Sequence, residues 1–237
     1  MNEADRETAT LHRAIWERFG RQPDVSPWRG RLQLPAGVSA MLGFVVPVEG
    51  DDIVFALGEA LARLEGSGCL LPFPPDYWHI TVVPPALLTE GPPGAAAESP
   101  PLLPASFAGE ALDAASAAVA ACGDFQVSVR GINAFRDVLV AVPYDGGRSL
   151  EIARVLRSAL PQLPQRYHTG HDPLPHISLA RYARDEGLES LIRLVEAERV
   201  TEFGAFHVDR LEMFVLPVHN GVPGAIQKRR IPLGRTP

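Results

Sequence analysis

Apolar positions recur along the chain with two periods, and these predict alternating strands and amphipathic helices. Residues 39–48 are almost continuously apolar and predict a buried strand. Asp51 or Asp52 is placed to cap the helix that follows. Residues 77–85, with the sequence YWHITVVPP, predict a short strand that ends at the double proline. The apolar face of the intervening helix is formed by Ile53, Leu57, Ala60, Leu61 and Leu64.

The second half of the chain repeats this order of elements. Its predicted elements are strands at 125–129 and 138–142, a helix at 149–160 and a strand at 173–182. In both halves a strand ending in Val-Pro leads into an acidic, glycine-containing turn that opens the helix. The spacing from Pro47 to His79 is 32 residues, and that from Pro143 to His176 is 33 residues. A unit repeated at this spacing predicts two lobes, residues 38–237, around a pseudo-twofold axis.

Two segments lie outside the repeat. Residues 1–37 predict an N-terminal extension with one short helix, because Leu11, Ile15 and Phe19 recur at helical spacing. Residues 84–109 are rich in Pro and Ala and predict a long loop, either a flap over the preceding strand or disordered chain. The remaining predicted elements are helices at 109–122 and after Asp185, and strands at 206–215 and 226–232.

Composition narrows the class of protein. Hydrophobic residues make up 46% of the chain and charged residues 21%, as in ordinary globular proteins. The net charge of −6 argues against binding to long DNA or RNA, which usually needs a basic surface. No secretory signal and no apolar run of membrane-spanning length is visible, so we expect a cytoplasmic protein without a membrane partner. Cys69 and Cys122 fit no metal or disulfide pattern and are expected in the core.

The repeat brings a histidine and a hydroxyl to the same place in each half. The tripeptide His-Ile-Thr at 79–81 is matched by His-Ile-Ser at 176–178. Side chains two positions apart in a strand share a face, so each histidine lies beside its hydroxyl residue. Around a pseudo-twofold axis both pairs line one cleft. Two imidazoles suit paired acid–base catalysis, and two hydroxyls suit the oxygens of a phosphate.

The paired motifs, HIT and PHISLAR, resemble those of the two-histidine (2H) phosphoesterase superfamily, most closely the bacterial branch of 2'-5' RNA ligase-like proteins and RNA 2',3'-cyclic phosphodiesterases. The resemblance covers residues 39–232. It implies an α+β fold in which two small antiparallel sheets face across a cleft, with helices outside. It also implies metal-independent phosphodiester chemistry without a cofactor, on a nucleotide or RNA-end substrate. His79 and His176 would be catalytic, and Thr81 and Ser178 would hold the phosphate.

For a 2',3'-cyclic phosphate, one histidine would activate water and the other would protonate the departing ribose oxygen. His176 as base and His79 as acid is the favoured assignment, and the reverse stays open. Strand parity adds Tyr77 beside His79 and Tyr182 beside His176 as possible substrate contacts. Arg181 has the wrong parity unless the strand ends before it, but its guanidinium suits phosphate. Arg136, near a predicted turn, is a further candidate.

Three alternatives stay open. His168, His171 and His176 crowd one segment and could form a metal site, although their spacing is not a standard zinc pattern. A second alternative is a non-catalytic module that binds a nucleotide or RNA end on the same fold. The third is a different phosphodiester substrate, such as a 2'-5'-linked oligonucleotide or a cyclic ADP-ribose phosphate.

Overall fold

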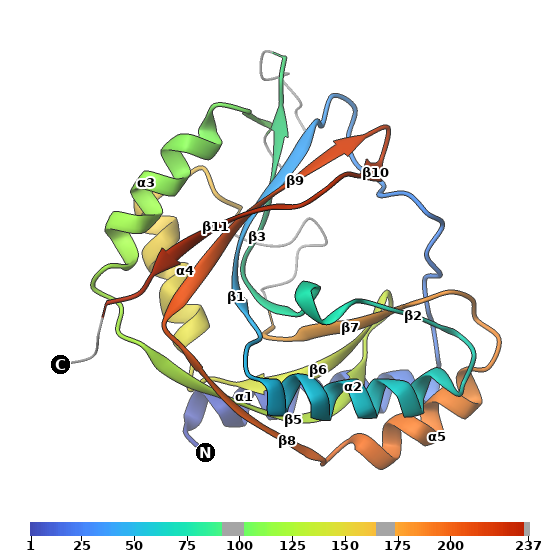
Figure 1. Cartoon of the computed structure of the whole chain (residues 1–237). Helices are drawn as coiled ribbons and strands as arrows, with labels where there is room; N and C mark the ends of the chain where they lie inside the picture. Colours follow the sequence, from blue (N-terminus) through green and yellow to red (C-terminus); the bar gives the residue numbers. More distant parts are fainter. Residues whose placement is uncertain (92–101, 165–173, 235–237) are drawn as a thin grey trace.

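The protein is a curled, mainly antiparallel sheet with helices against it, seen in a computed structural model that describes residues 1–91, 102–164 and 174–234 (Figure 1). In the first lobe the strands lie in the order β10 (Val222–Pro223), β9 (Arg210–His219), β1 (Ala40–Pro47) and β3 (His79–Thr89), with β11 (Gln227–Pro232) on β9 and β4 (Leu102–Pro104) on β3. In the second lobe the order is β7 (Ile177–Tyr182), β6 (Val138–Tyr144), β5 (Phe125–Ala134) and β8 (Glu202–Val208), with β2 (Leu70–Pro72) on β7.

The two lobes meet where β3 pairs with β7. Among the described residues, Ile80 and Ile177 form the one paired position between these strands. The order of strands on either side is symmetric, because β1 flanks β3 as β6 flanks β7. The predicted α+β fold with a repeated unit is therefore confirmed. The two antiparallel sheets are continuous through this one pair, so the lobes form one curled sheet.

Each repeated helix covers the lobe that its own strands do not form. Helix α2 (Asp51–Glu65) follows β1 but packs against β2, β8 and α5 (Leu188–Glu198) of the second lobe. Helix α4 (Arg148–Ala159) follows β6 but packs against β3 and α3 (Phe107–Val119) of the first lobe. This exchange ties the two lobes together through their cores. Trp78 and Ile80 are buried, as the strand pattern predicts, and so are the two free cysteines.

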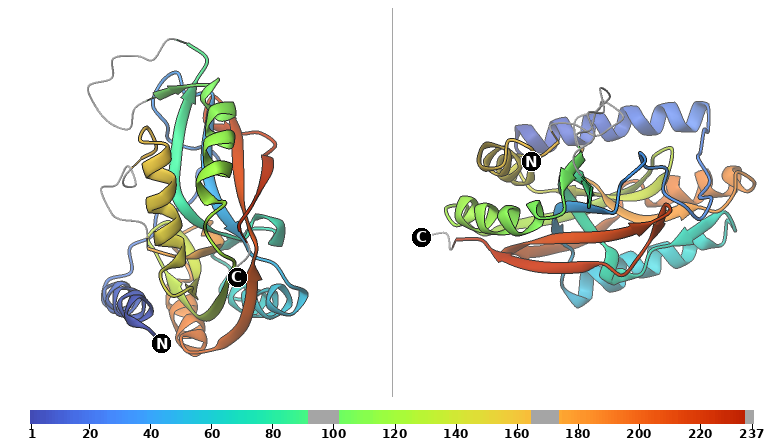
Figure 2. Two further views of the ribbon diagram at one scale, coloured as in Figure 1. Left: turned by 90° about the vertical axis from the view of Figure 1, so that its left-hand side faces the viewer. Right: turned by 90° about the horizontal axis from the view of Figure 1, so that it is seen from above.

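The N-terminal helix α1 (Glu3–Arg21) lies on the opposite side of the second lobe's sheet from α2 and α5 (Figure 2). It contacts β5 and β6. The helix has 19 residues and is longer than the short helix predicted. Its buried face contains His12, Trp16 and Phe19, whereas Leu11 is 47% exposed. The predicted apolar face was therefore wrong by one position at Leu11 and at Ile15.

The prediction of a long loop at 84–109 was wrong at both ends. β3 continues through Pro84 and Pro85 to Thr89, because the prolines fall where the register between β1 and β3 is irregular and neither has a partner in β1. A residue without an N–H group is tolerated at such an irregularity. Strand β4 and the start of α3 take up the other end, and residues 92–101 lie outside the described part of the chain.

The strand predicted at 206–215 is two strands. β8 ends at Val208 and β9 begins at Arg210, so Asp209 marks the passage from the second lobe to the first. Apolar residues on both sides of this passage made the segment look continuous. The passage carries the chain from one edge of the curled sheet to the other, where β9 pairs with β1.

Candidate functional site

The four predicted active-site residues lie around the junction of the lobes. Ile80 and Ile177 are fully buried, so both point into the cores. The residues on either side of each isoleucine therefore point to the opposite face, into the cleft. All four are partly exposed. They are His79 and Thr81 in the first lobe, and His176 and Ser178 in the second.

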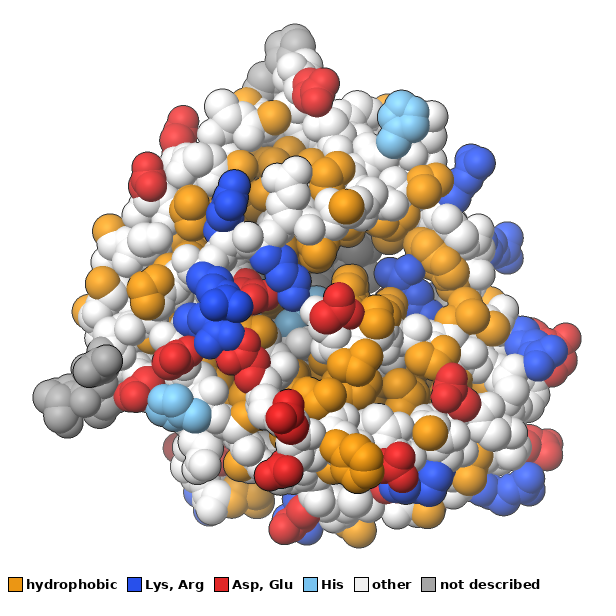
Figure 3. Space-filling model, viewed as in Figure 1, with side chains coloured by type: hydrophobic (Ala, Val, Ile, Leu, Met, Phe, Trp, Pro, Cys, Tyr) orange, Lys and Arg blue, Asp and Glu red, His pale blue; other side chains and the backbone are white. Residues whose placement is uncertain are grey.

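The register at the junction brings these side chains together in a two-by-two arrangement. Antiparallel strands paired at Ile80 and Ile177 place His79 opposite Ser178 and Thr81 opposite His176. Each histidine thus lies near the hydroxyl of the other repeat as well as its own. Figure 3 shows a hollow on one face of the molecule, with histidine surface inside it and Lys and Arg side chains at its edge.

Both histidine rings are held in the same way. His79 Nδ1 lies 2.6 Å from the carbonyl oxygen of Tyr77, and His176 Nδ1 lies 2.8 Å from that of Leu174. A carbonyl can only accept, so in each ring the proton of the neutral form is on Nδ1. Neither Nε2 makes a hydrogen bond to a described residue. Each imidazole therefore presents an unprotonated Nε2 that no described residue engages.

Burial keeps both imidazoles neutral at pH 7. It lowers the pKa of His79 to about 4, against the opposing effect of the hydrogen bond to Tyr77, and with small further contributions from His176 and Lys228. Burial also lowers the pKa of His176, opposed by its hydrogen bond to Leu174 and by Asp137. Acid–base catalysis needs a proton on one of the two imidazoles. A bound anion would raise the pKa of the ring beside it and so favour its protonated form.

Stability should therefore fall with acid. The pKa of His79 is about 4 in the folded protein and about 6.5 when unfolded, so between these values the unfolded chain binds more protons. We expect this group to lower the free energy of unfolding by about 2 kcal/mol between pH 7 and pH 5. Urea unfolding of wild type and His79→Gln at both pH values measures it. An equal fall in the free energy of unfolding from pH 7 to pH 5 in both proteins would contradict the lowered pKa of His79.

The hydroxyls of Thr81 and Ser178 are available for a ligand. Neither side chain makes a hydrogen bond to any residue that the structure describes, and both lie on partly exposed strand positions. A strand hydroxyl without an internal partner can donate to an anion at no structural cost. The two hydroxyls and the two Nε2 atoms thus line one face with matched proton donors and acceptors.

The wall of the cleft in the first lobe is aromatic and cationic. The rings of Tyr77 and Phe214 lie 5.3 and 6.2 Å from that of His79. Lys228 Nζ donates to the carbonyl of Asp76 at 3.0 Å and forms an ion pair at 3.1 Å with Glu212. Tyr77 belongs to a short 3₁₀ turn rather than to the strand predicted for it, yet its ring reaches His79.

A bulge in β7 reverses the predicted parity of Arg181 and Tyr182. Val140 pairs with Ser178 but Leu139 pairs with Ala180, so one residue of β7 is skipped. Two successive buried residues follow Ser178, and Arg181 returns to its face. Its guanidinium lies over the rings of Trp28, at 3.9 Å, and Phe73, at 5.2 Å.

Tyr182 does not face the cleft, and the prediction that it does was wrong. Its side chain is fully buried, and its hydroxyl donates to the carbonyl oxygen of Phe135 at 3.0 Å. Arg136 is exposed in the turn between β5 and β6 and forms an ion pair with Asp24 at 3.2 Å. His168 and His171, the other members of the alternative metal site, lie outside the described residues.

Some side chains near the histidines were not predicted. Phe214, beside His79, and Trp28, beside Arg181, come from segments far away in the sequence, and no local pattern pointed to them. Lys228 is the only lysine among the 22 Lys and Arg residues of the chain, and this feature of the sequence could have marked it as a candidate near the site. His12 contacts the backbone beside His176, as described below, and no pattern in the sequence indicated it.

These features define a class of protein: a two-lobed α+β fold with one His-x-Ser/Thr pair from each repeat at the junction. The sequence profile of the 2'-5' RNA ligase superfamily matches residues 59–219, and the chain belongs to this superfamily, the 2H phosphoesterases. The resemblance of the two motifs is thereby confirmed at the level of the superfamily. No curated protein sequence matches the chain.

Solved structures share the fold at low identity. TT0787 of Thermus thermophilus is 19% identical, with a TM-score of 0.58 over 82% of this chain and 98% of that one. E. coli LigT complexed with phosphate is 14% identical, with a TM-score of 0.55 over 84% and 99%. Kluyveromyces marxianus Usb1 with uridine monophosphate is 12% identical, with a TM-score of 0.50 over 82% and 99%. No described helix is long and apolar enough to span a membrane.

Proposed function

We propose that this protein is a metal-independent phosphodiesterase that hydrolyses a 2',3'-cyclic phosphate, or a related RNA-derived cyclic or 2'-5' phosphodiester. One observation carries the proposal. Each of two symmetry-related histidines is fixed through Nδ1 by the carbonyl two residues before it, which leaves both Nε2 atoms free beside unpartnered hydroxyls. A pure binding site has no need of two such proton-transfer groups, whereas general acid–base catalysis needs both.

The reaction follows from this arrangement. One Nε2 takes a proton from water as the water oxygen bonds to phosphorus. The other, protonated on binding of the anionic substrate, gives its proton to the ribose oxygen as the bond from phosphorus to that oxygen breaks. The product is a 2'- or 3'-phosphomonoester with a free hydroxyl beside it. Thr81 and Ser178 donate to the non-bridging oxygens, on which charge grows in the transition state.

Charged residues near the two rings bear on which histidine is the base and which is the acid. Lys228 lowers the proton affinity of His79, whereas Asp137 raises that of His176. Burial is the larger cause of the lowered pKa of both rings, so these contributions do not decide the assignment, and His176 as base with His79 as acid stays the proposed one. In a ligating direction the roles would be exchanged. The position of the phosphate in the product, set by which ribose oxygen leaves, is the corresponding observable.

Two of the residues suggested by the sequence suit the rest of the substrate. Arg181 makes no ion pair with a described residue and its guanidinium lies over two aromatic rings, so its N–H groups suit an anion or a base. Tyr77 makes an edge contact with His79 and stacks one face on Phe73, at 4.7 Å, so a base would stack on its other face. We assign both to contacts with a nucleotide or RNA end. Arg136 is tied to Asp24 and is the weaker candidate.

The decisive experiment is hydrolysis of nucleoside 2',3'-cyclic monophosphates by the full chain with EDTA present. We expect turnover with EDTA to stay within twofold of turnover without it, and a single phosphomonoester isomer as product. Loss of activity with EDTA and its return with a divalent metal would contradict the metal-independent mechanism.

The binding-module alternative has its own signature in the same experiment. If no cyclic nucleotide or 2'-5'-linked dinucleotide is turned over, calorimetric titration with the nucleotides decides between the readings. Binding without turnover would support the module. Absence of binding as well would exclude this substrate class.

A further inference from the structure

The N-terminal helix lies outside residues 59–219, which match the superfamily, yet it touches the backbone of the second catalytic motif. Its contact residue is His12, which is 4% exposed. His12 Nε2 lies 3.0 Å from the carbonyl oxygen of Pro175. Because a carbonyl accepts, His12 donates from Nε2. This carbonyl belongs to the peptide that joins Pro175 to His176. The hydrogen bond therefore fixes the plane of the peptide from which the His176 side chain projects.

The other nitrogen of His12 is equally committed. Asn133 Nδ2, in β5, donates to His12 Nδ1 at 3.1 Å and to the carbonyl oxygen of His12 at 2.8 Å. The Asn133 side-chain oxygen accepts from the N–H of Ala134 at 2.8 Å. The amide orientation is thus fixed by the backbone, and the amide in turn fixes the imidazole. Burial lowers the pKa of His12 to about 4, so the ring is neutral and keeps a single donor.

An aromatic ring links His12 to His176 by a second route. The ring of Phe135 stacks on that of His12, with centroids 5.6 Å apart and planes 24° apart. The centroid of Phe135 is also 5.2 Å from that of His176. Phe135 is itself fixed, since its carbonyl accepts from the hydroxyl of Tyr182 and its N–H donates to Val138. The catalytic ring is therefore braced by its backbone and by its neighbour.

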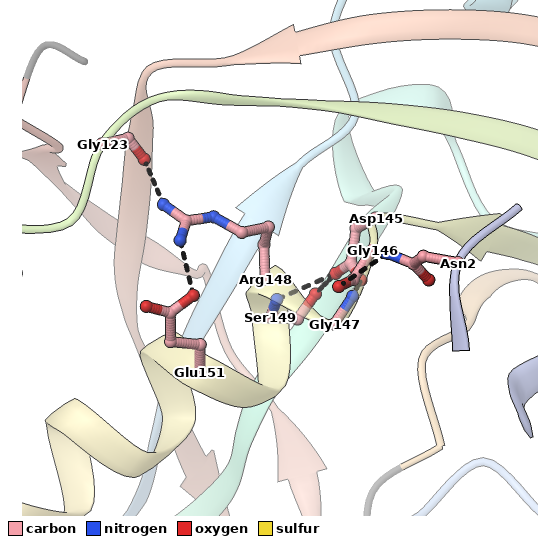
Figure 4. Close-up of polar contacts among 8 residues, drawn as sticks. All are labelled: Asn2, Gly123, Asp145, Gly146, Gly147, Arg148, Ser149 and Glu151. Atoms are coloured by element: carbon pink, nitrogen blue, oxygen red, sulfur yellow. Dashed lines mark hydrogen bonds and ion pairs between the residues drawn. The ribbon is translucent and has the colours of Figure 1, made fainter. Parts of the chain in front are cut away.

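The helix is anchored along its length, so these contacts are not incidental. At its start Asn2 Nδ2 donates to the carbonyl oxygen of Gly146 at 3.2 Å (Figure 4), and the N–H of Gly146 donates to Asp5 at 3.0 Å. Gly146 lies in the turn before α4. After the helix, the N–H groups of Ser26 and Trp28 donate to the carbonyls of Arg136 and Tyr182. The extension is thus held against the second lobe on both sides of His12.

His79 has no such brace from the extension among the described contacts. The peptide before it is held from within the first lobe, because the N–H of Val48 donates to the carbonyl oxygen of Trp78 at 3.1 Å and Trp78 Nε1 donates to the carbonyl of Phe73 at 3.2 Å. Before His176, the corresponding carbonyl oxygen, that of Pro175, accepts instead from a side chain of α1, His12 Nε2. The two halves of the dyad are therefore positioned by different means.

We propose that His12 is a positioning residue for catalysis: it holds the Pro175–His176 peptide so that His176 Nε2 points into the cleft. The extension is then part of the active site rather than an appendage. This inference rests on the proposed function for its kinetic consequences, but the orientation of His176 is a property of the protein without substrate. The role needs a donor at the position of Nε2, and it needs no proton exchange at His12.

The test compares His12→Leu with His12→Gln. Leucine fills similar space but leaves the Pro175 carbonyl without the His12 donor, and leaves Asn133 Nδ2 with only the backbone carbonyl of residue 12. Glutamine places its amide donor near the position of histidine Nε2. With a 2',3'-cyclic nucleotide we expect His12→Leu to lower kcat about 10- to 100-fold with KM within threefold, since small misplacements of a catalytic group cost this much. His12→Gln should recover to within threefold of wild type.

Leu11→Gln is the matched control, because it lies on the exposed face of the same helix and should leave kcat unchanged. Thermal unfolding of all variants separates folding from positioning. A folded His12→Leu with wild-type kcat would overturn the inference. Equal losses in His12→Leu and His12→Gln would overturn it too, because they would show that bulk packing alone is at stake.

A spectroscopic measurement keeps the inference testable whatever the activity. In wild type the ¹⁵N resonances of the His176 ring should report a proton on Nδ1, as the Leu174 contact requires. We expect His12→Leu to shift the ring towards mixed tautomers and His12→Gln to keep it. Unchanged ring resonances in His12→Leu would overturn the positioning role. If wild type turns over no substrate but these shifts appear, the proposed function fails and the positioning inference stands.

Discussion

Replacing either histidine of the dyad by glutamine is expected to lower kcat/KM for a 2',3'-cyclic nucleotide by about 10²- to 10⁴-fold, the usual contribution of general acid–base groups. Glutamine keeps a polar side chain of similar length but cannot exchange a proton at pH 7. Each ring makes one hydrogen bond to a described residue, from Nδ1 to a backbone carbonyl, so glutamine loses no other polar contact. The measurement is steady-state hydrolysis by His79→Gln and His176→Gln, with folding checked by circular dichroism.

The double variant sharpens this prediction. If the two imidazoles act as one relay, removing the second should cost much less than removing the first. We therefore expect kcat/KM of His79→Gln/His176→Gln to lie within about tenfold of that of the less active single variant. His219→Gln, an exposed histidine at the end of β9, is the control and should keep wild-type activity. Wild-type rates in either single variant would refute the two-histidine mechanism.

The pH profile should separate the roles of the pair. Both imidazoles are neutral in the free cleft at pH 7, so the acid must gain its proton as the anionic substrate binds. The acid limb of kcat/KM then reports the free protein, and that of kcat the complex. The histidine whose pKa is lowered less in the complex would be the acid.

The sequence alone was sufficient for the repeat and for the place of the two histidines at the junction, for a local reason. A strand alternates its side chains at every step, so the burial of Ile80 and Ile177 follows from the motif itself. The nearly equal spacing of the two histidines from their Val-Pro strands, 32 and 33 residues, then implied a twofold arrangement. The direct pairing of β3 with β7 sharpened this picture from facing walls to neighbouring strands.

What the sequence could not supply were irregularities and long-range contacts. The bulge in β7 moves Arg181 into the cleft and Tyr182 into the core, and no residue type marks it. The register irregularity that lets β3 run through Pro84 is likewise a property of the paired strands. The choice of His12 rather than Leu11 for the buried face of α1 depends on Asn133, 121 residues away.

The hydroxyls of the two motifs provide the other large expected effect. Thr81→Val and Ser178→Ala should each lower kcat by about 10²-fold, because each removes one donor to the oxygens that gain charge in the transition state. Neither hydroxyl bonds a described residue, so stability should change little; valine also suits the strand position of Thr81. Thr81→Ser and Ser178→Thr keep the donors and serve as matched controls.

The balance between kcat and KM tells what the hydroxyls do. If they act on the transition state, kcat falls while KM for the cyclic nucleotide changes little. If they only hold the ground-state phosphate, KM rises with kcat unchanged, and the affinity for the phosphomonoester product falls in parallel. In that case the rate enhancement would rest on the imidazoles, and Thr81 and Ser178 would be binding residues. Full activity in Thr81→Val/Ser178→Ala would remove both hydroxyls from the site.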